Sequence, residues 1–220
     1  MHKNIKNLLK ITDKVKLKVK ECNFTNDPKI IAVSKTFKLD NILPLIDHGH
    51  NHFGENKVQE AIEKWSETKN LNKNLKLHMI GKLQTNKVKL AVPLFDYIHS
   101  LDNLKLAEKI SIEQKKNKKN IKIFIQVNLE KEEQKNGIDP NNLSQFYETC
   151  IKKFNLDIIG LMCIPPNNKP VKPFFLEMNR MNSALGLKEL SMGMSSDYLE
   201  AIECGATYVR VGSQIFGNRV

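Results

Sequence analysis

The sequence is poor in cysteine and has no long apolar runs. Among its 220 residues, the cysteines Cys22, Cys150, Cys163 and Cys204 lie far apart and form no Cys-x-x-Cys pair. This spacing indicates neither a zinc knuckle nor a disulfide framework, and it favours a reducing compartment. No apolar run approaches the ~18 residues that cross a bilayer, and the charged N-terminus lacks the apolar core of a secretory signal. We therefore predict a cytoplasmic protein without a membrane-spanning or exported segment.

Aromatic residues are also scarce, at 7% of the chain, whereas basic residues are abundant. Lys and Arg number 35 against 24 Asp and Glu, which gives a net charge of +11. Such an excess can mark a surface for nucleic acid or for an acidic membrane. The lysines, however, are spread over helix faces and loops, and no aromatic RNA-binding motif interleaves them. We interpret the excess as a solvated surface and expect no specific nucleic-acid or membrane partner, with a nucleic-acid binder as the alternative.

Hydrophobic residues make up 40% of the chain and charged residues 27%, which is enough apolar material for a sizeable core. No Pro-rich or Gly/Ser-rich linker divides the sequence, so we predict a single domain over residues 1–220. Residues 2–22 place apolar side chains at three- and four-residue steps. This spacing predicts an N-terminal helix that packs one apolar stripe against the body of the protein.

Beyond this helix, short apolar runs alternate with longer helical patterns to the end of the chain. Strands are predicted at Ile30–Lys35, Asn51–Gly54, Leu77–Gly81, Tyr97–Ser100, Ile121–Asn128, Ile158–Cys163, Glu189–Gly193 and Thr207–Gly212. Helices are predicted between them at Asp40–His48, Lys57–Trp65, Thr85–Ala91, Asn103–Lys116, Asn141–Phe154, Pro173–Leu185 and Ser196–Cys204. The alternation predicts an α/β fold, a (β/α)8 barrel of parallel strands. An open doubly wound sheet is the competing topology.

The first predicted strand ends with a lysine, Lys35. Strand alternation places Ile31, Val33 and Lys35 on one face, so the lysine ends a barrel-lining row at the rim where barrels hold their active sites. An ammonium there is costly unless it is solvated, paired or converted, for example to a Schiff base with an aldehyde cofactor. A rim lysine that extends into water is the alternative.

Residues rich in hydroxyl groups and glycine follow the last two predicted strands. Ser195 and Ser196 follow the seventh strand, and Gly212 and Ser213 lie at the exit of the eighth. Helix N-termini and glycine-lined backbone amides bind phosphate, and barrels often hold a phosphate after these two strands. We therefore expect a phosphorylated ligand, although Ser195 or Ser196 could instead simply cap a helix.

Closure of a barrel makes its eighth strand the neighbour of its first, so Arg210 and Lys35 are predicted to lie on adjoining strands. A molecule with an aldehyde on one side and a phosphate on the other could contact both, and pyridoxal 5′-phosphate (PLP) has this form. Arg210 would point inward with Tyr208 and could reach the pyridine nitrogen, where a guanidinium weakens the electron sink. A buried structural ion pair is the alternative for Arg210.

Seven segments, in order along almost the whole chain, resemble the pyridoxal phosphate homeostasis protein family, also called PLP-binding proteins. They are IAVSKTF around Lys35, FGENKVQE at Phe53–Glu60, HMIGKLQTNK at His78–Lys87, QVNLEKEEQKNGI at Gln126–Ile138, GLMCIP at Gly160–Pro165, LSMGMSSD at Leu190–Asp197 and VRVGSQIFG at Val209–Gly217. Several of these segments are long and specific to the family.

The resemblance implies a barrel of the alanine racemase N-terminal domain type, preceded by one extra helix. It implies that Lys35 carries PLP as a Schiff base, that Ser195, Gly212 and Ser213 bind its phosphate, and that Arg210 contacts its pyridine nitrogen.

The resemblance also implies that Asn56, His78 and Met162 line the cofactor pocket. Two of these residues have an ordinary structural explanation as well. Asn56 could cap the following helix, and a methionine such as Met162 is more often part of a core.

The family's role is intracellular control of PLP, and so of vitamin B6, without an established reaction. A racemase needs acid–base groups on both faces of its substrate, and in alanine racemase one of them comes from outside the barrel. This chain ends at Val220, just beyond the eighth predicted strand, so we expect no second domain to supply that group. We therefore expect a monomeric, non-catalytic PLP carrier with apo-PLP enzymes as candidate recipients. The alternative is a PLP-dependent enzyme resembling an amino-acid racemase.

Three alternating histidines, His48, His50 and His52, could mimic metal ligands on one strand face. The family has no histidine cluster there, and Gly49 suggests the end of a helix, where a nearby histidine is favourable. We expect no metal.

Overall fold

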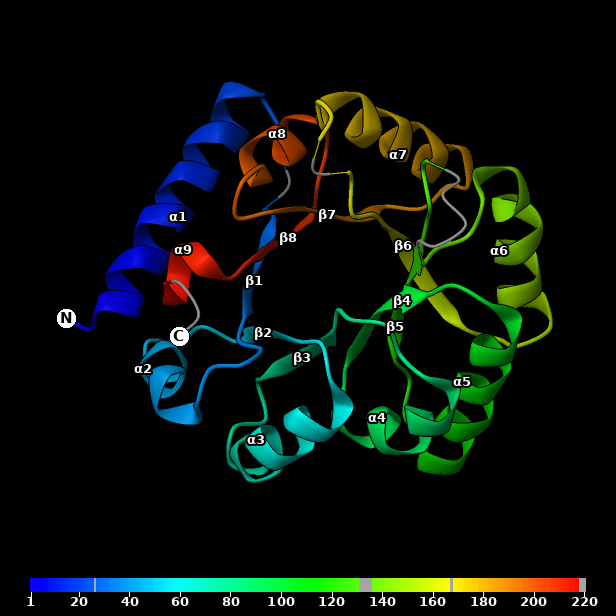
Figure 1. Ribbon diagram of the computed structural model, residues 1–220, viewed down its shortest axis with the longest axis horizontal. Coiled ribbons are helices and arrows are strands. Elements are labelled where there is room, and N and C mark those ends of the chain that lie inside the picture. Colours follow the sequence, from blue (N-terminus) through cyan, green and yellow to red (C-terminus); the bar gives the residue numbers. More distant parts are fainter. Residues whose placement is uncertain (26, 131–135, 167, 218–220) are drawn as a thin grey trace.

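The computed structural model describes residues 1–25, 27–130, 136–166 and 168–217. Within these residues, parallel strands β1 to β8 form a closed barrel in sequence order, and helices surround it (Figure 1). The strands are β1 (Lys29–Val33), β2 (His52–Glu55), β3 (Lys76–Met79), β4 (Tyr97–Leu101), β5 (Lys122–Gln126), β6 (Asp157–Met162), β7 (Glu189–Met194) and β8 (Tyr208–Val211). Pairing of β8 with β1 confirms the predicted (β/α)8 barrel and excludes the open sheet.

The helices lie between the strands and at both ends of the described chain. The α-helices are α1 (Lys3–Glu21), α2 (Leu43–Asp47), α3 (Val58–Leu71), α4 (Val88–Leu94), α5 (Leu104–Asn117), α6 (Leu143–Lys152), α7 (Lys172–Ala184), α8 (Tyr198–Glu203) and α9 (Ser213–Phe216). Short 3-10 helices occur at η1 (Leu39–Asn41), η2 (Thr85–Lys87) and η3 (Pro140–Asn142). Among the described residues, none of the helices combines the length and apolar character needed to span a bilayer.

The strands read as nearly continuous apolar runs because both of their faces are buried. One face packs against the surrounding helices and forms the main core. The other face fills the barrel with a second cluster, which consists of Ile31, Tyr97, Phe124, Met162 and Tyr208. The barrel is therefore a packed core rather than a pore, and a ligand can enter only at one of its mouths.

Helix α1 lies outside the barrel beside α8 and α9 (Figure 1). Its buried stripe includes Leu8 and Val15, which the sequence spacing predicts, and also Ile11, which it does not. Asn7 Nδ2 donates to the Ile215 carbonyl oxygen of α9 at 2.9 Å, so α1 also holds the last described helix. This contact links the N-terminal helix to the segment that follows β8.

Several predicted boundaries were wrong, and the differences affect the site. Strand β1 ends at Val33, so Lys35 lies in the turn after the strand instead of at its end. Helix α8 begins at Tyr198 rather than at Ser196, and α9 was not predicted. Part of the motif at Gln126–Ile138, residues 131–135, lies outside the described residues.

Substituting Gly160 tests the packing of the barrel wall. An added Cβ at Gly160 would lie 1.8 Å from the Glu189 carbonyl oxygen in the adjacent strand β7. We expect Gly160→Ala to separate these strands, to lower the free energy of unfolding by about 3 kcal/mol, and to lower Tm by about 5–10 °C. Gly186→Asn is the matched control, because Gly186 has open space around it and Asn tolerates its φ of +68°. Equal Tm values for the two variants would contradict the packing argument.

Candidate functional site

A cavity of about 800 Å³ opens at the carboxyl ends of the strands. Its lining residues lie at the carboxyl ends of β1, β7 and β8 or in the segments that follow β1, β2, β3, β6, β7 and β8, which is the face where parallel barrels hold ligands. Six predicted site residues meet there, namely Lys35, Asn56, Ser195, Arg210, Gly212 and Ser213. The structure therefore brings together an amine, a guanidinium, hydroxyl groups and glycine-rich backbone from distant parts of the chain.

The other two predicted site residues, His78 and Met162, are not among the residues that line this cavity. Both are fully buried inside the barrel, Met162 in the interior apolar cluster and His78 stacked on Tyr97 with ring centroids 4.2 Å apart. Both belong to strands rather than to the loops that follow them. For Met162 the structural explanation as a core residue holds, and His78 reaches the site only through other side chains.

Lys35 lies in a tight turn between Ser34 and Phe37. The Phe37 N–H donates to the Ser34 carbonyl oxygen at 3.2 Å, which closes the turn around Lys35 and Thr36. Thr36 has a φ of +69°, whereas Lys35 is not among the residues with positive φ. This combination is that of a type II turn, whose third position favours glycine. A threonine at that position strains the backbone by about 1–3 kcal/mol.

The loops after β7 and β8 face each other across one part of the cavity. The Gly212 N–H donates to Ser195 Oγ at 3.2 Å, and Gln214 Nε2 donates to the Ser195 carbonyl oxygen at 2.5 Å. Ser213 begins α9, where the Ile215 and Phe216 N–H groups donate to the Gly212 carbonyl oxygen and the N–H groups of the first two residues, Ser213 and Gln214, have no intrahelical acceptor. Hydroxyl groups and backbone amides that converge in this way suit an anion.

The helix-capping alternatives for this region were wrong. Asp197, not Ser195 or Ser196, precedes the first residue of α8, and its Oδ1 accepts from the Met194 N–H at 2.6 Å. Lys57 occupies the corresponding position before α3, so Asn56 is not the cap either. Asn56 Oδ1 is buried and has no hydrogen-bond partner among the described residues. An orphaned oxygen of this kind beside a cavity indicates that a ligand or water completes its hydrogen bonding.

Arg210 is a buried cation at the base of the cavity, with 5% of its surface exposed. One guanidinium nitrogen donates to Ser191 Oγ at 2.7 Å and another to the Cys163 carbonyl oxygen at 2.9 Å. Among the described residues, none of its hydrogen bonds reaches a carboxylate, so the predicted alternative of an ion pair does not hold there. Burial lowers the pKa of Arg210, yet a guanidinium stays protonated in proteins. The cavity therefore contains a positive charge that an electron-rich ligand would complement.

A chain of buried histidines continues from Arg210 through the barrel interior. Ser191 Oγ lies 2.8 Å from His99 Nδ1, and His99 Nε2 lies 2.9 Å from His78 Nδ1. His78 Nε2 then lies 2.9 Å from His52 Nδ1 at the start of β2. The chain thus runs from the cavity toward the opposite mouth of the barrel.

One proton arrangement gives a hydrogen-bond partner to every group in this chain. A guanidinium only donates, so Ser191 Oγ accepts from Arg210; in this arrangement Ser191 gives its own proton to His99 Nδ1. His99 is then protonated on Nε2 and donates to His78 Nδ1, and His78 donates in the same sense to His52. Each imidazole is neutral in this arrangement. Sequence analysis missed Ser191 and His99, which strand alternation could have placed on the inner face.

Burial keeps these rings uncharged. It lowers the pKa of His50 and of His52 to about 4, and it lowers the pKa of His78 and of His99 well below the ordinary value. His50 Nε2 lies 2.9 Å from the His52 carbonyl oxygen. His50 and His52 are thus part of the barrel's hydrogen bonding, and the described residues contain no cluster of three or more His, Cys, Asp or Glu suited to a metal ion.

The lowered histidine pKa values predict loss of stability in mild acid. Unfolded histidines titrate near 6.5, so between pH 6.5 and about 4 the unfolded chain binds protons that the folded barrel does not. The free energy of unfolding should therefore fall as the pH drops through this window and should receive no histidine contribution above it. His52→Asn keeps an acceptor for His78. The slope of the free energy of unfolding against pH should be smaller in this variant by the contribution of about one bound proton.

Urea unfolding at a series of pH values measures this slope for the wild type and for His52→Asn. His2→Asn is the control, because His2 lies on the surface at the start of α1. Identical slopes for His52→Asn and the wild type would contradict a buried, neutral His52.

The fold and the residues at its strand ends define a class of barrel. Residues 10–220 match the family of the alanine racemase N-terminal domain. The alanine racemase of Clostridium difficile 630 shares this fold with a TM-score of 0.68 at 16% identity, over 94% of this chain and 57% of that one. At that identity the likeness concerns the fold alone.

Relatives of similar length narrow the class further. The pyridoxal phosphate homeostasis protein of Aquifex aeolicus is 39% identical over 203 residues, covering 88% of each chain. That of Haemophilus influenzae is 35% identical over 97% of this chain and 94% of its own, and that of Homo sapiens is 37% identical over 87% and 77%. The chain belongs to the pyridoxal phosphate homeostasis protein family, which confirms the resemblance seen in the sequence.

A solved structure within this range of identity is PipY of Synechococcus elongatus PCC7942, with PLP bound. It is 35% identical, has a TM-score of 0.81, and the match covers 92% of this chain and 100% of that chain. A structure of PipY without PLP matches with a TM-score of 0.80.

Proposed function

We propose that residues 1–220 form one domain that binds PLP in the cavity at the carboxyl ends of the strands and serves PLP homeostasis. The observation that carries this proposal is that Lys35, Arg210, and the segments of Ser195 and Ser213 after β7 and β8 line one cavity. Family membership and the PLP held by PipY support it.

The described residues fit the groups of PLP. Ser195 and Ser213 offer hydroxyls for the phosphate, and the start of α9 offers backbone N–H groups beside Gly212, whose own N–H donates to Ser195 Oγ. Arg210 offers guanidinium N–H groups to the unprotonated pyridine nitrogen. Asn56 brings an oxygen that lacks a partner among the described residues. When bound, PLP supplies an aldehyde carbon with which the amine of Lys35 forms a reversible Schiff base, a C=N bond, with release of water.

His78 and Met162 belong to the layer beneath the cofactor. In this proposal Met162 fills the apolar interior, and His78 passes the hydrogen-bond order set by Arg210 across the barrel. Neither side chain contacts PLP directly. The family resemblance implied that these two residues line the cofactor pocket; in this proposal they instead support the residues that line it.

The lining of the cavity favours a carrier over an enzyme. Racemisation needs an acid and a base on opposite faces of the substrate. Among the described lining residues, Lys35 is the one amine, Arg210 stays protonated, and the others are apolar, amide or hydroxyl groups, so the lining offers no pair of acid and base side chains for both faces of a substrate. We therefore propose slow or absent turnover, with a racemase-like enzyme as the alternative.

The cysteines bear on the compartment in which the protein works. The four cysteines are free thiols, which suits the reducing cytoplasm. We propose a cytoplasmic monomer that holds PLP reversibly and can release it to apo-PLP enzymes.

Lys35→Ala tests the covalent attachment. We expect purified wild-type protein loaded with PLP to be yellow, and the variant to lose the visible absorbance of the C=N bond because no amine remains at that position. Borohydride reduction followed by mass spectrometry should place the cofactor on Lys35. Lys38→Ala is the control, since Lys38 follows the same turn but does not line the cavity. An unchanged spectrum of Lys35→Ala would refute the assignment.

Exchange of the α-proton distinguishes the carrier from the enzyme. A panel of amino acids in deuterated water, incubated with PLP-loaded protein for hours, should show exchange far below ordinary enzyme turnover of about 1–10³ per second. Nuclear magnetic resonance of the α-proton measures this rate, with free PLP as the background. Sustained turnover of one amino acid near about 1 per second would favour the racemase-like enzyme.

A further inference from the structure

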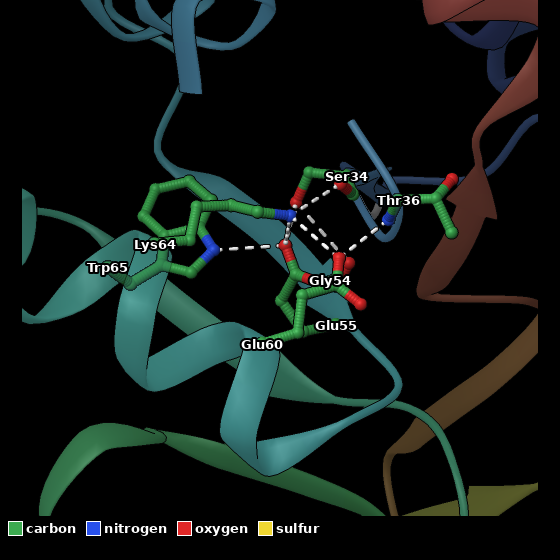
Figure 2. Close-up of polar contacts among 7 residues, drawn as sticks. All are labelled: Ser34, Thr36, Gly54, Glu55, Glu60, Lys64 and Trp65. Carbon is green, nitrogen blue, oxygen red and sulfur yellow. Dashed lines mark hydrogen bonds and ion pairs between the residues drawn. The ribbon is translucent and has the colours of Figure 1, made fainter. Parts of the chain in front are cut away.

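Two side chains of helix α3, Glu60 and Lys64, hold the turn through the residues on either side of Lys35 (Figure 2). On one side of Lys35, Lys64 Nζ donates to the Ser34 carbonyl oxygen at 2.9 Å. On the other side, the Thr36 N–H donates to Glu60 Oε1 at 2.6 Å. Glu60 and Lys64 lie one helical turn apart, so both side chains extend from the same face of α3.

The turn needs an external contact of this kind. Thr36 adopts a φ of +69° at a position that favours glycine, and a branched side chain makes that conformation less favourable still. Residues held in such conformations persist only where the surrounding structure determines them. The contact to Glu60 acts directly on the strained residue.

The residues that hold the turn are themselves anchored in the core. Lys64 Nζ also donates to Glu55 Oε1 and to Glu60 Oε1, each at 3.0 Å. Glu55 Oε1 accepts further hydrogen bonds from Trp65 Nε1 at 2.9 Å and from Ser34 Oγ at 2.7 Å (Figure 2). Lys64 Nζ thus donates to Ser34 O, Glu55 Oε1 and Glu60 Oε1, which accounts for the three N–H donors of its ammonium.

Burial makes this anchor stiff. The side chain of Glu55 is 0% exposed, that of Lys64 is 8% exposed and that of Glu60 is 28% exposed. Breaking a buried ion pair leaves an uncompensated charge, so the pair resists separation. Positions on a rigid helix also hold a site more precisely than positions on a loop.

We propose that Glu60 and Lys64 are positioning residues for Lys35. By holding Ser34 O and the Thr36 N–H, they fix the turn in the conformation that directs the Lys35 amine into the cavity. This inference rests on the proposed attachment of PLP to Lys35. A turn fixed in advance spends no conformational freedom when the covalent bond forms, which speeds bond formation.

Removal of the Glu60 carboxylate tests the proposal. Two rates are measured: appearance of the visible band after PLP is mixed with cofactor-free protein, and reductive methylation of Lys35 in cofactor-free protein, followed by peptide mass spectrometry. We expect Glu60→Ala to slow band formation by about tenfold and to change the methylation rate of Lys35 more than that of other lysines. Glu60→Gln keeps an oxygen that can accept from Thr36 and should stay within about threefold of the wild type.

Two further variants separate positioning from general damage. Glu63→Ala removes a carboxylate from the same helix that contacts the Gln59 side chain, and it should leave both rates unchanged. Thr36→Gly combined with Glu60→Ala should recover most of the lost rate, because glycine adopts positive φ without steric cost. Thermal unfolding of each variant reports whether the fold is intact.

The outcomes are distinguishable. Wild-type protein that forms no visible band with PLP would refute the proposed function itself. A wild-type band together with a Glu60→Ala rate within twofold of the wild type would overturn the inference alone. Slow band formation in Glu60→Ala that Thr36→Gly fails to recover, accompanied by a lower Tm, would also overturn it, because general destabilisation would then explain the loss.

Discussion

Pairing of β8 with β1 is the constraint on which the site depends. It sets Ile31 opposite Arg210 and so places the turn after β1 beside the loops that follow β7 and β8. Lys35 and the loops after β7 and β8 come from opposite ends of the sequence, and closure of the barrel brings them to one cavity. Helix α1 reinforces the same seam through the bond from Asn7 to α9.

The barrel interior combines apolar packing with one ordered polar chain. The guanidinium of Arg210 donates to Ser191 Oγ, and hydrogen bonds continue from Ser191 to His99 and from His99 to His78. Buried polar groups of this kind are costly unless each finds a partner, and a fully paired network then allows a single arrangement. His99 also stacks on Phe124 with ring centroids 4.3 Å apart, so ring packing and hydrogen bonding fix the same side chain.

Much of the fold could be predicted from the sequence, because strands buried on both faces give short apolar runs that separate clearly from helical spacing. Strand alternation also placed Arg210 inward. The end of β1 was predicted two residues too late, because the local alternation of apolar residues does not reveal the turn at Lys35 and Thr36, whose neighbours Glu60 and Lys64 come from a later helix. Helix α9 is too short to leave a periodic signal. The motif resemblance implied that His78 lines the cofactor pocket, but it could not show how deeply this side chain lies within the barrel.

The order in which the chain is made bears on when the cavity first exists. Lys35 leaves the ribosome long before Arg210, and until the wall between them closes, that lysine is an ordinary flexible amine. A nascent chain therefore lacks the cavity proposed to bind PLP, which forms only when the barrel closes. A ligand that binds only the finished fold stabilises it by mass action, so PLP bound as proposed would favour the closed barrel over the unfolded chain.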